Sequence, residues 1–236
     1  MSDVSWLTAR PIAHRGLHDM NRACWENTLP AFAAAAEAGY AIECDVHLSA
    51  DGVPMVFHDE ALKRLTGADG NIWERRAADL GRLRIGGTAE PVPTLGEMLA
   101  LVAGRVPVVI ELKGSEGHDA DLVERVVQVL AGYDGAVALM SFEHRLLRDL
   151  AAQASGRPRG LTAEGSSPAA MEAHFSMLAH DLSFVSYSVL QLPNAFVSFV
   201  RDRLSMPVIT WTVRDVATVD ATARHADQMT FEGFLP

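Results

Sequence analysis

Short apolar or β-branched runs alternate along this chain of 236 residues with segments of helical periodicity. Eight runs are candidate strands, at residues 11–14, 40–46, 107–113, 136–141, 159–162, 183–187, 207–212 and 227–230. Helical segments lie between them at 28–38, 94–102, 119–130, 143–152, 168–178, 193–203 and 215–224. Strands that alternate with helices form a parallel sheet. Eight such units in a chain of this length predict an α/β fold, the (β/α)8 or TIM barrel.

A doubly wound open sheet is the alternative. It usually has fewer strands, and the turn after the first strand, AHRGLH at 13–18, is not a GxGxxG nucleotide loop. Residues 60–93 interrupt the strand–helix rhythm, so they are predicted to be an insertion after the second strand of a single domain over residues 1–236. The predicted helix ends are capped by Asn27 or Thr28 and by Gly39, and Thr94 with Glu97 forms a capping box.

The charge balance limits the possible partners. The chain has 30 acidic and 20 basic side chains and a formal net charge of −10, and no basic cluster, which argues against a nucleic-acid partner. A hydrophobic content of 49% excludes disorder, and no apolar run has the length of a transmembrane span. The N-terminus has no secretory pattern, so a cytoplasmic location is expected, with Cys24 and Cys44 as free thiols.

Ionisable residues follow three of the predicted strands. His14 and Arg15 end the first strand, the second carries Glu43 and Asp45, and Glu111 and Lys113 end the third. Successive side chains of a strand alternate between its two faces. Glu43 and Asp45 therefore lie on the same face of the second strand, and Glu111 and Lys113 lie on the same face of the third. The carboxyl ends of barrel strands meet at one mouth, where the chemistry of such enzymes takes place.

Three carboxylates at one mouth repel one another unless a cation or a proton neutralises them. Ligation by oxygen alone suits one hard divalent cation, Mg²⁺, Ca²⁺ or Mn²⁺, better than Zn²⁺. Glu43, Asp45 and Glu111 are the predicted ligands. Arg15 and Lys113 could hold a phosphate with that cation, or could themselves neutralise the carboxylates.

A turn at residues 51–52 is expected to fold the following extended run back beside the second strand. His58, at the end of that run, would then face His14 across the mouth. Two imidazoles beside a metal suit acid–base catalysis, with one accepting a proton and the other donating one. His47 shares the face of Glu43 and is a candidate for indirect contact with the site, and the remaining histidines are expected to be structural or exposed.

At this point the chain resembles the glycerophosphodiester phosphodiesterase family. The matching motifs are AHRG at 13–16, ENT at 26–28, IECDV at 42–46, DG at 51–52, FHD at 57–59, LTG at 65–67, PTL at 93–95, IELK at 110–113, SF at 141–142 and WTV at 211–213. The resemblance implies a TIM barrel with a small insertion after the second strand.

The resemblance also implies roles for individual residues. Glu43, Asp45 and Glu111 would bind the cation, and His14 and His58 would be the general acid–base pair. Arg15 and Lys113 would bind the phosphate, Trp211 would form a wall of the pocket, and Glu26 and Asn27 would orient His14 or Arg15. The chain departs from the family pattern at Trp25, where many members have proline, and at Glu232, because the last strand more often ends in an Asp-containing motif.

The expected reaction is metal-dependent hydrolysis of a small-molecule glycerophosphodiester to glycerol 3-phosphate and an alcohol. One alternative is an enzyme of the lysophospholipase D type, or one that stops at a cyclic phosphate, which would have an apolar rim at the mouth. The other is a non-catalytic ligand-binding barrel. Such a barrel would be expected to have lost a metal ligand or a histidine, and all five are present.

Overall fold

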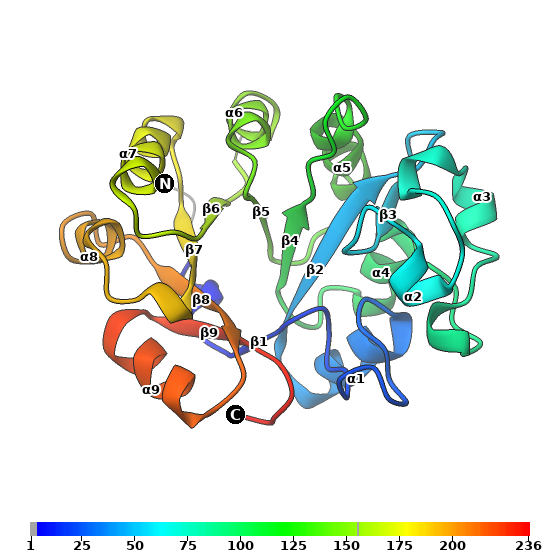
Figure 1. Ribbon diagram of the computed structural model, residues 1–236, viewed down its shortest axis with the longest axis horizontal. Helices are drawn as coiled ribbons and strands as arrows, with labels where there is room; N and C mark the ends of the chain where they lie inside the picture. Colours follow the sequence, from blue (N-terminus) through cyan, green and yellow to red (C-terminus); the bar gives the residue numbers. More distant parts are fainter. Residues whose placement is uncertain (1–3, 155) are drawn as a thin grey trace.

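The computed structural model describes residues 4–154 and 156–236. In this part of the chain, eight parallel strands form a closed ring surrounded by helices (Figure 1). β1 pairs with both β2 and β9, which closes the ring. In ring order the strands are β1 Ile12–Ala13, β2 Ala41–Leu48, β4 Val108–Leu112, β5 Val137–Ser141, β6 Arg159–Ala163, β7 Phe184–Ser188, β8 Val208–Val213 and β9 Gln228–Phe231. The predicted (β/α)8 barrel is confirmed, and each strand lies within two residues of its predicted bounds.

The outer helices follow the predicted segments closely. They are α1 Leu29–Ala38, α4 Leu95–Val102, α5 Leu122–Leu130, α6 His144–Gln153, α7 Pro168–Met177, α8 Ala195–Asp202 and α9 Val216–His225. The Thr94–Glu97 capping box is present, and Gly39 ends α1 with a φ of 76°. Thr28 is the N-cap residue of α1, within the predicted pair, but no side chain caps the helix, because the Thr28 hydroxyl donates to the Trp25 carbonyl and the Asn27 amide donates to Asp45. None of the helices within the described ranges is long and apolar enough to cross a membrane.

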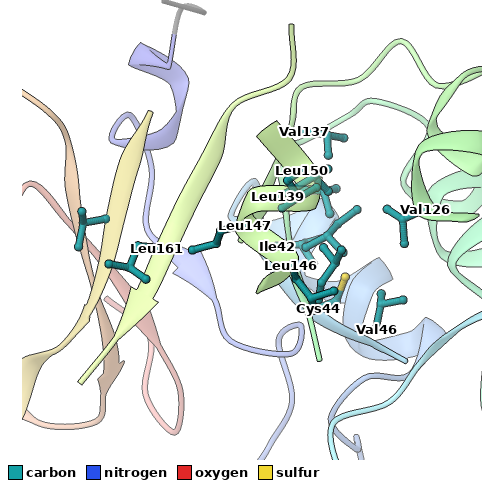
Figure 2. Close-up of a cluster of buried hydrophobic side chains, with 14 of the residues drawn as sticks. Ile42, Cys44, Val46, Val126, Val137, Leu139, Leu146, Leu147, Leu150 and Leu161 are labelled. Atoms are coloured by element: carbon teal, nitrogen blue, oxygen red, sulfur yellow. The ribbon is translucent and has the colours of Figure 1, made fainter. Parts of the chain in front are cut away.

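Alternation along β2 separates the core from the site. Its outward side chains, Ile42, Cys44 and Val46, are buried among residues of β5 and α6 such as Leu139 and Leu147 (Figure 2). Full burial of one large aliphatic side chain contributes about 1.5–3 kcal/mol. The inward side chains of the same strand include Glu43 and Asp45, so the packing of the outer layer determines which face carries the carboxylates. Cys24 and Cys44 are both free thiols, as predicted.

The inside of the barrel changes character along the strands. Near their amino ends it is filled by a separate apolar cluster, which comprises Leu7, Ile12, Ala41, Val109, Ala138, Met140, Phe184 and Ile209. Leu7, in the short helix η1 Ser5–Leu7, is fully buried in this cluster. Two residues further along each strand, on the same face, the inward side chains include His14, Glu43, Glu111 and Ser186. The barrel interior therefore has an apolar base and a polar mouth.

The segment after β2 returns to the mouth and then packs on itself. β3 Pro54–Val56 pairs antiparallel with β2, as the turn at residues 51–52 predicted. The following residues form α2 Lys63–Thr66, η2 Ile72–Glu74, α3 Ala77–Leu80 and η3 Ile85–Gly87. They surround a small core of their own, made of Met55, Phe57, Leu62, Leu65, Ile72, Leu80, Ile85 and Val92. Trp25 packs against this core, and a Cβ at Gly86 would lie 2.0 Å from its ring. Two short helices, η4 Leu178–His180 and η5 Val189–Gln191, flank β7.

Gly160 has no side chain, which leaves room for the Phe184 ring in the apolar base of the barrel. It lies opposite Phe184 in the β6–β7 pairing, and a Cβ at Gly160 would lie 2.3 Å from the Phe184 ring. Gly160→Ala should therefore lower the free energy of unfolding by about 1–3 kcal/mol through overpacking. Gly132→Ala is the matched control, because a Cβ there meets no described atom within 4 Å. Urea unfolding of both variants checks this, and equal stabilities would show that the base of the barrel is loosely packed.

Candidate active site

A cavity of about 270 Å³ opens at the carboxyl ends of the strands. Of the residues predicted for the site, those that line it are His14, Arg15, Glu43, His58, Glu111, Lys113 and Trp211. Asp45 is buried beside Lys113 and Arg15, and Glu26 and Asn27 lie behind the lining, in contact with Arg15 and Asp45. The structure therefore brings the whole predicted set together from six different segments of the chain.

Glu43, Asp45 and Glu111 form a buried carboxylate cluster. One oxygen from each lies within 4.8 Å of the others. Asp45 accepts a hydrogen bond from Asn27 Nδ2 at 2.9 Å, and Lys113 Nζ lies 3.1 Å from its other oxygen and also donates to Glu111. Glu43 Oε2 accepts from the Arg15 backbone N–H at 2.9 Å, while Glu43 Oε1 is buried with no hydrogen-bond partner in the described chain.

Burial and mutual repulsion act against ionisation of this cluster. Burial raises the pKa of the Glu43 carboxyl well above its ordinary value, and Asp45 and Glu111 raise it further. Burial also raises the pKa of Glu111. For Asp45 burial acts in the same direction, but Lys113 and Arg15 overcome it and hold the pKa below its ordinary value.

The donor set fits a hard divalent cation. Three carboxylates face two cationic side chains, Arg15 and Lys113, and Arg15 is shared with Glu26. Glu43 Oε1 has no hydrogen-bond partner in the described chain, so this oxygen is free to coordinate a cation. Oxygen ligands suit Mg²⁺, Ca²⁺ or Mn²⁺. Glu43, Asp45 and Glu111 are therefore suited to hold such an ion.

The first histidine is held by a carboxylate at the end of the last strand. His14 Nδ1 lies 2.5 Å from Glu232 Oε2, and Arg214 Nε donates to the other oxygen of Glu232 at 2.6 Å. Burial alone would raise the pKa of Glu232, but its contacts with His14, His18 and Arg214 hold it far below the ordinary value. An ionised carboxylate only accepts hydrogen bonds, so Nδ1 of His14 carries the proton. Its Nε2 faces the pocket, 3.9 Å from Glu43 Oε2.

The second histidine has an equivalent arrangement. His58 Nδ1 lies 2.8 Å from Asp59 Oδ1, and Arg64 Nε donates to Asp59 Oδ2 at 2.6 Å. Burial raises the pKa of Asp59, but Arg64 and His58 outweigh this and lower it to about 2. His47, the candidate for indirect contact, donates from Nε2 to the His58 carbonyl at 3.0 Å. Burial lowers the pKa of both His14 and His58, and the carboxylates bound to them act in the opposite direction.

Glu26 joins the two sides of the mouth. Its Oε1 accepts from Arg15 at 2.6 Å and from Arg64 at 2.8 Å, and Asn21 donates to its Oε2 at 2.5 Å. Although burial opposes ionisation, Arg64 and Arg15 lower the pKa of Glu26 to about 2. Glu26 thus contacts both Arg15 and the arginine that binds Asp59.

An aromatic wall completes the cavity. Trp211 and Phe142 meet edge to face with ring centroids 5.2 Å apart, and Lys113 Nζ lies 5.8 Å from the Phe142 ring centre. The sequence motifs SF at 141–142 and FHD at 57–59 include Phe142 and Asp59, but the sequence predicts no role for either residue. It predicts no role for Glu232 either. Glu232 could have been found because it lies two residues beyond Thr230, on the inward face of the last strand.

The sequence profile of the glycerophosphoryl diester phosphodiesterase family matches residues 14–235, which include every residue of the site described above. The chain belongs to this family.

Individual relatives agree with the profile. A glycerophosphodiester phosphodiesterase from Caldanaerobacter subterraneus is 32% identical over 149 residues, or 59% of this chain; the match spans 60% of that enzyme's length, less than two thirds. A phosphodiesterase from Oleispira antarctica, solved with the product sn-glycerol-3-phosphate, superposes with a TM-score of 0.80 at 27% identity over 94% of this chain and 92% of its own. The Thermotoga maritima glycerophosphodiester phosphodiesterase gives a TM-score of 0.74 at 26% identity, over 93% and 92% of the two chains.

Replacing Glu26 with Gln should lower the free energy of unfolding at pH 7 by about 2–3 kcal/mol. A pKa lowered from 4.5 to about 2 stabilises the fold above pH 4.5, and this stabilisation is lost as the pH falls toward 2. The difference from the parent protein should therefore shrink to about half by pH 3. Urea unfolding at pH 7, 4 and 3 measures it. Glu37→Gln, at an exposed position of α1, should change little, and a difference for Glu26→Gln that does not vary with pH would refute the ion-pair account.

Divalent cations should raise the melting temperature of the protein, because an ion that binds only the folded state stabilises it by about 2.7 kcal/mol at 100 times its dissociation constant. Glu43→Gln should remove most of this increase while leaving the metal-free protein folded, because the amide is nearly isosteric and uncharged. Thermal unfolding with EDTA, Mg²⁺, Ca²⁺ or Mn²⁺ measures the effect. An equal increase in the parent and the variant would place the ion elsewhere.

Proposed function

We propose that this chain hydrolyses glycerophosphodiesters to glycerol 3-phosphate and an alcohol, using one divalent cation and the acid–base pair His14 and His58. The observation that carries the proposal is that two imidazoles, each bound at Nδ1 by an ionised carboxylate, line the same pocket as Glu43 and Glu111, which with Asp45 form a cluster of three buried carboxylates. The phosphodiesterase from Oleispira antarctica, with sn-glycerol-3-phosphate as its product, supports the choice of substrate.

Each charged residue has a role in this reaction. Glu43, Asp45 and Glu111 would hold the cation, which when bound polarises a phosphoryl oxygen. Arg15 and Lys113 stabilise the negative charge that develops on the phosphoryl group. Arg15 and Lys113 both contact Asp45, so their positive charges lie beside the proposed cation site, where the phosphate would bind.

The histidines move the protons. With Nδ1 of each ring bound to Glu232 or Asp59, the Nε2 atoms are the ones available to substrate. One ring is neutral, and its Nε2 accepts the proton of the attacking oxygen, which belongs to water or to the neighbouring glycerol hydroxyl through a cyclic phosphate. The other ring starts protonated at both nitrogens and donates its Nε2 proton to the departing alcohol, so that one ring gains the proton that the other loses. Glu232 and Asp59 stabilise whichever ring becomes charged. Trp211 forms the wall beside the organic part of the substrate, and Glu26 and Asn27 support Arg15 and Asp45 from behind.

A lysophospholipid is the second candidate substrate. Leu190, in η5, lines the same cavity and is 81% exposed, so an apolar chain leaving the pocket would meet an apolar side chain at the rim. Phe142 and Trp211 would extend that contact inward. Assays with glycerophosphocholine and lysophosphatidylcholine separate the two candidates, and phosphorus NMR of the products distinguishes complete hydrolysis from release of a cyclic phosphate.

His14→Ala and His58→Ala should each reduce kcat by about 10²–10⁴, because each variant loses one proton-transfer group. His225→Ala, at the end of α9 and outside the cavity, is the control and should retain activity. The assay follows release of glycerol 3-phosphate, with circular dichroism to confirm the fold. Near-parental turnover in both variants would refute the role of His14 and His58 as the acid–base pair. Activity that survives complete chelation would show that the reaction does not need the metal.

A further inference from the structure

The mouth of the barrel has two chemically different halves. Strands β1, β2 and β4 contribute the histidine, carboxylates and lysine described above. On the opposite side, β6 to β9 contribute inward side chains without ionisable groups at the same depth, namely Thr162, Ser186, Trp211 and Thr230. This neutral half is where the cavity meets the apolar base of the barrel.

These side chains form a continuous floor. Thr162 and Ser186 are partners in the β6–β7 pairing, and they lie two residues beyond Gly160 and Phe184 of the apolar base. Thr162 and Thr230 are each 2% exposed and Ser186 is fully buried. All of them nevertheless line the cavity, so their side chains border the space that a ligand would occupy.

Their polar atoms have no partner within the described chain. Thr162 Oγ1, Ser186 Oγ, Thr230 Oγ1 and Trp211 Nε1 are all buried without a hydrogen bond. Buried hydroxyls elsewhere are satisfied: Ser141 Oγ donates to the Leu112 carbonyl and Thr210 Oγ1 bonds to Thr222 Oγ1, each at 2.7 Å. A buried polar atom without a partner is costly, so four of them on one floor indicate a ligand that supplies the missing bonds.

The chemistry of the floor selects the kind of ligand. Hydroxyl groups both donate and accept, and the indole N–H donates, so the complementary group is one or more neutral hydroxyls. Glu164, just after β6, also lines the cavity, but its side chain is exposed, unlike the buried side chains of the floor. We propose that Thr162, Ser186, Thr230 and the Trp211 N–H form a polyol subsite, which binds free hydroxyl groups of the substrate opposite the phosphate-cleaving residues. The proposal rests on the proposed function and adds that a polyhydroxylated diester is the preferred substrate.

The bound hydroxyls can come from the retained glycerol or from the departing alcohol. Three substrates distinguish these sources: glycerophosphoglycerol, glycerophosphocholine, whose departing alcohol has no free hydroxyl, and a glycerophosphoglycerol analogue whose retained half lacks its terminal hydroxyl. The variants are Thr162→Val, Ser186→Ala and their combination. Thr210→Val, on the outward face of β8, removes a buried threonine hydroxyl that already has a partner and is the control.

Each hydroxyl variant should lower kcat/KM on glycerophosphoglycerol about 2–10-fold, as expected for one lost hydrogen bond. The loss should disappear on the substrate that lacks the bound hydroxyl: on glycerophosphocholine if the departing alcohol is bound, and on the deoxy analogue if the retained glycerol is bound. Because no protein hydrogen bond is lost, the melting temperature of the double variant should stay equal or rise. Thr210→Val should lower the melting temperature and leave kcat/KM unchanged.

An equal loss on all three substrates, or no loss on any, would overturn the polyol subsite while leaving the phosphodiesterase activity in place. If the parent protein cleaves none of the three, the proposed function fails, and saturation-transfer NMR with glycerol and with propan-1-ol then tests the subsite alone. Preferential binding of glycerol by the parent and not by the double variant supports it. Equal signals from both proteins refute it.

Discussion

The arrangement of the active site depends on the burial of three carboxylates, Glu43, Asp45 and Glu111, within 4.8 Å of one another. Such a cluster is unfavourable alone, because each negative charge loses its hydration and repels the others. The surrounding residues reduce this cost in different ways: Lys113 and Arg15 supply positive charge, and Asn27 donates a hydrogen bond to Asp45. A divalent cation would complete the compensation, so the same electrostatic requirement places the proposed metal ligands and the proposed phosphate-binding residues together.

The two histidines have the same arrangement of hydrogen-bond partners, although the partners come from different segments of the chain. Each Nδ1 is bound by a carboxylate whose second oxygen accepts from an arginine, in the order His14, Glu232, Arg214 and in the order His58, Asp59, Arg64. Glu26 contacts both Arg64 and Arg15, so the inserted segment and the barrel share one network of charges. The insertion therefore supports the mouth of the barrel in addition to enclosing a small core.

Much of the fold could be predicted from sequence, because strand and helix periodicity reports local burial. The inward pairs Glu43/Asp45 and Glu111/Lys113 were visible for the same reason, and the structure brings them together. Contacts between distant segments were not visible: Arg64 lies in the short helix α2 of the insertion, and its pairing with Glu26 depends on how the insertion folds. Thr28 was correctly placed at the start of α1, but the hydrogen bond from the neighbouring Asn27 amide to Asp45 was not visible, because the two residues are distant in sequence. The unpartnered hydroxyls of Thr162 and Ser186 depend on the absence of neighbours, which no local pattern records.

The alternation along β2, with Ile42, Cys44 and Val46 outward and Glu43 and Asp45 inward, constrains how this protein could diverge. Inserting or deleting a single residue in that strand would turn the two carboxylates into the layer beneath the helices and turn the aliphatic side chains into the cavity. Changes in chain length are therefore incompatible with this strand, although loops at the mouth that carry none of the site residues can change length. New substrate preferences in descendants of this chain would have to arise in those loops or by point substitution on the β6–β9 side, while β2, which carries two of the proposed metal ligands, keeps its length.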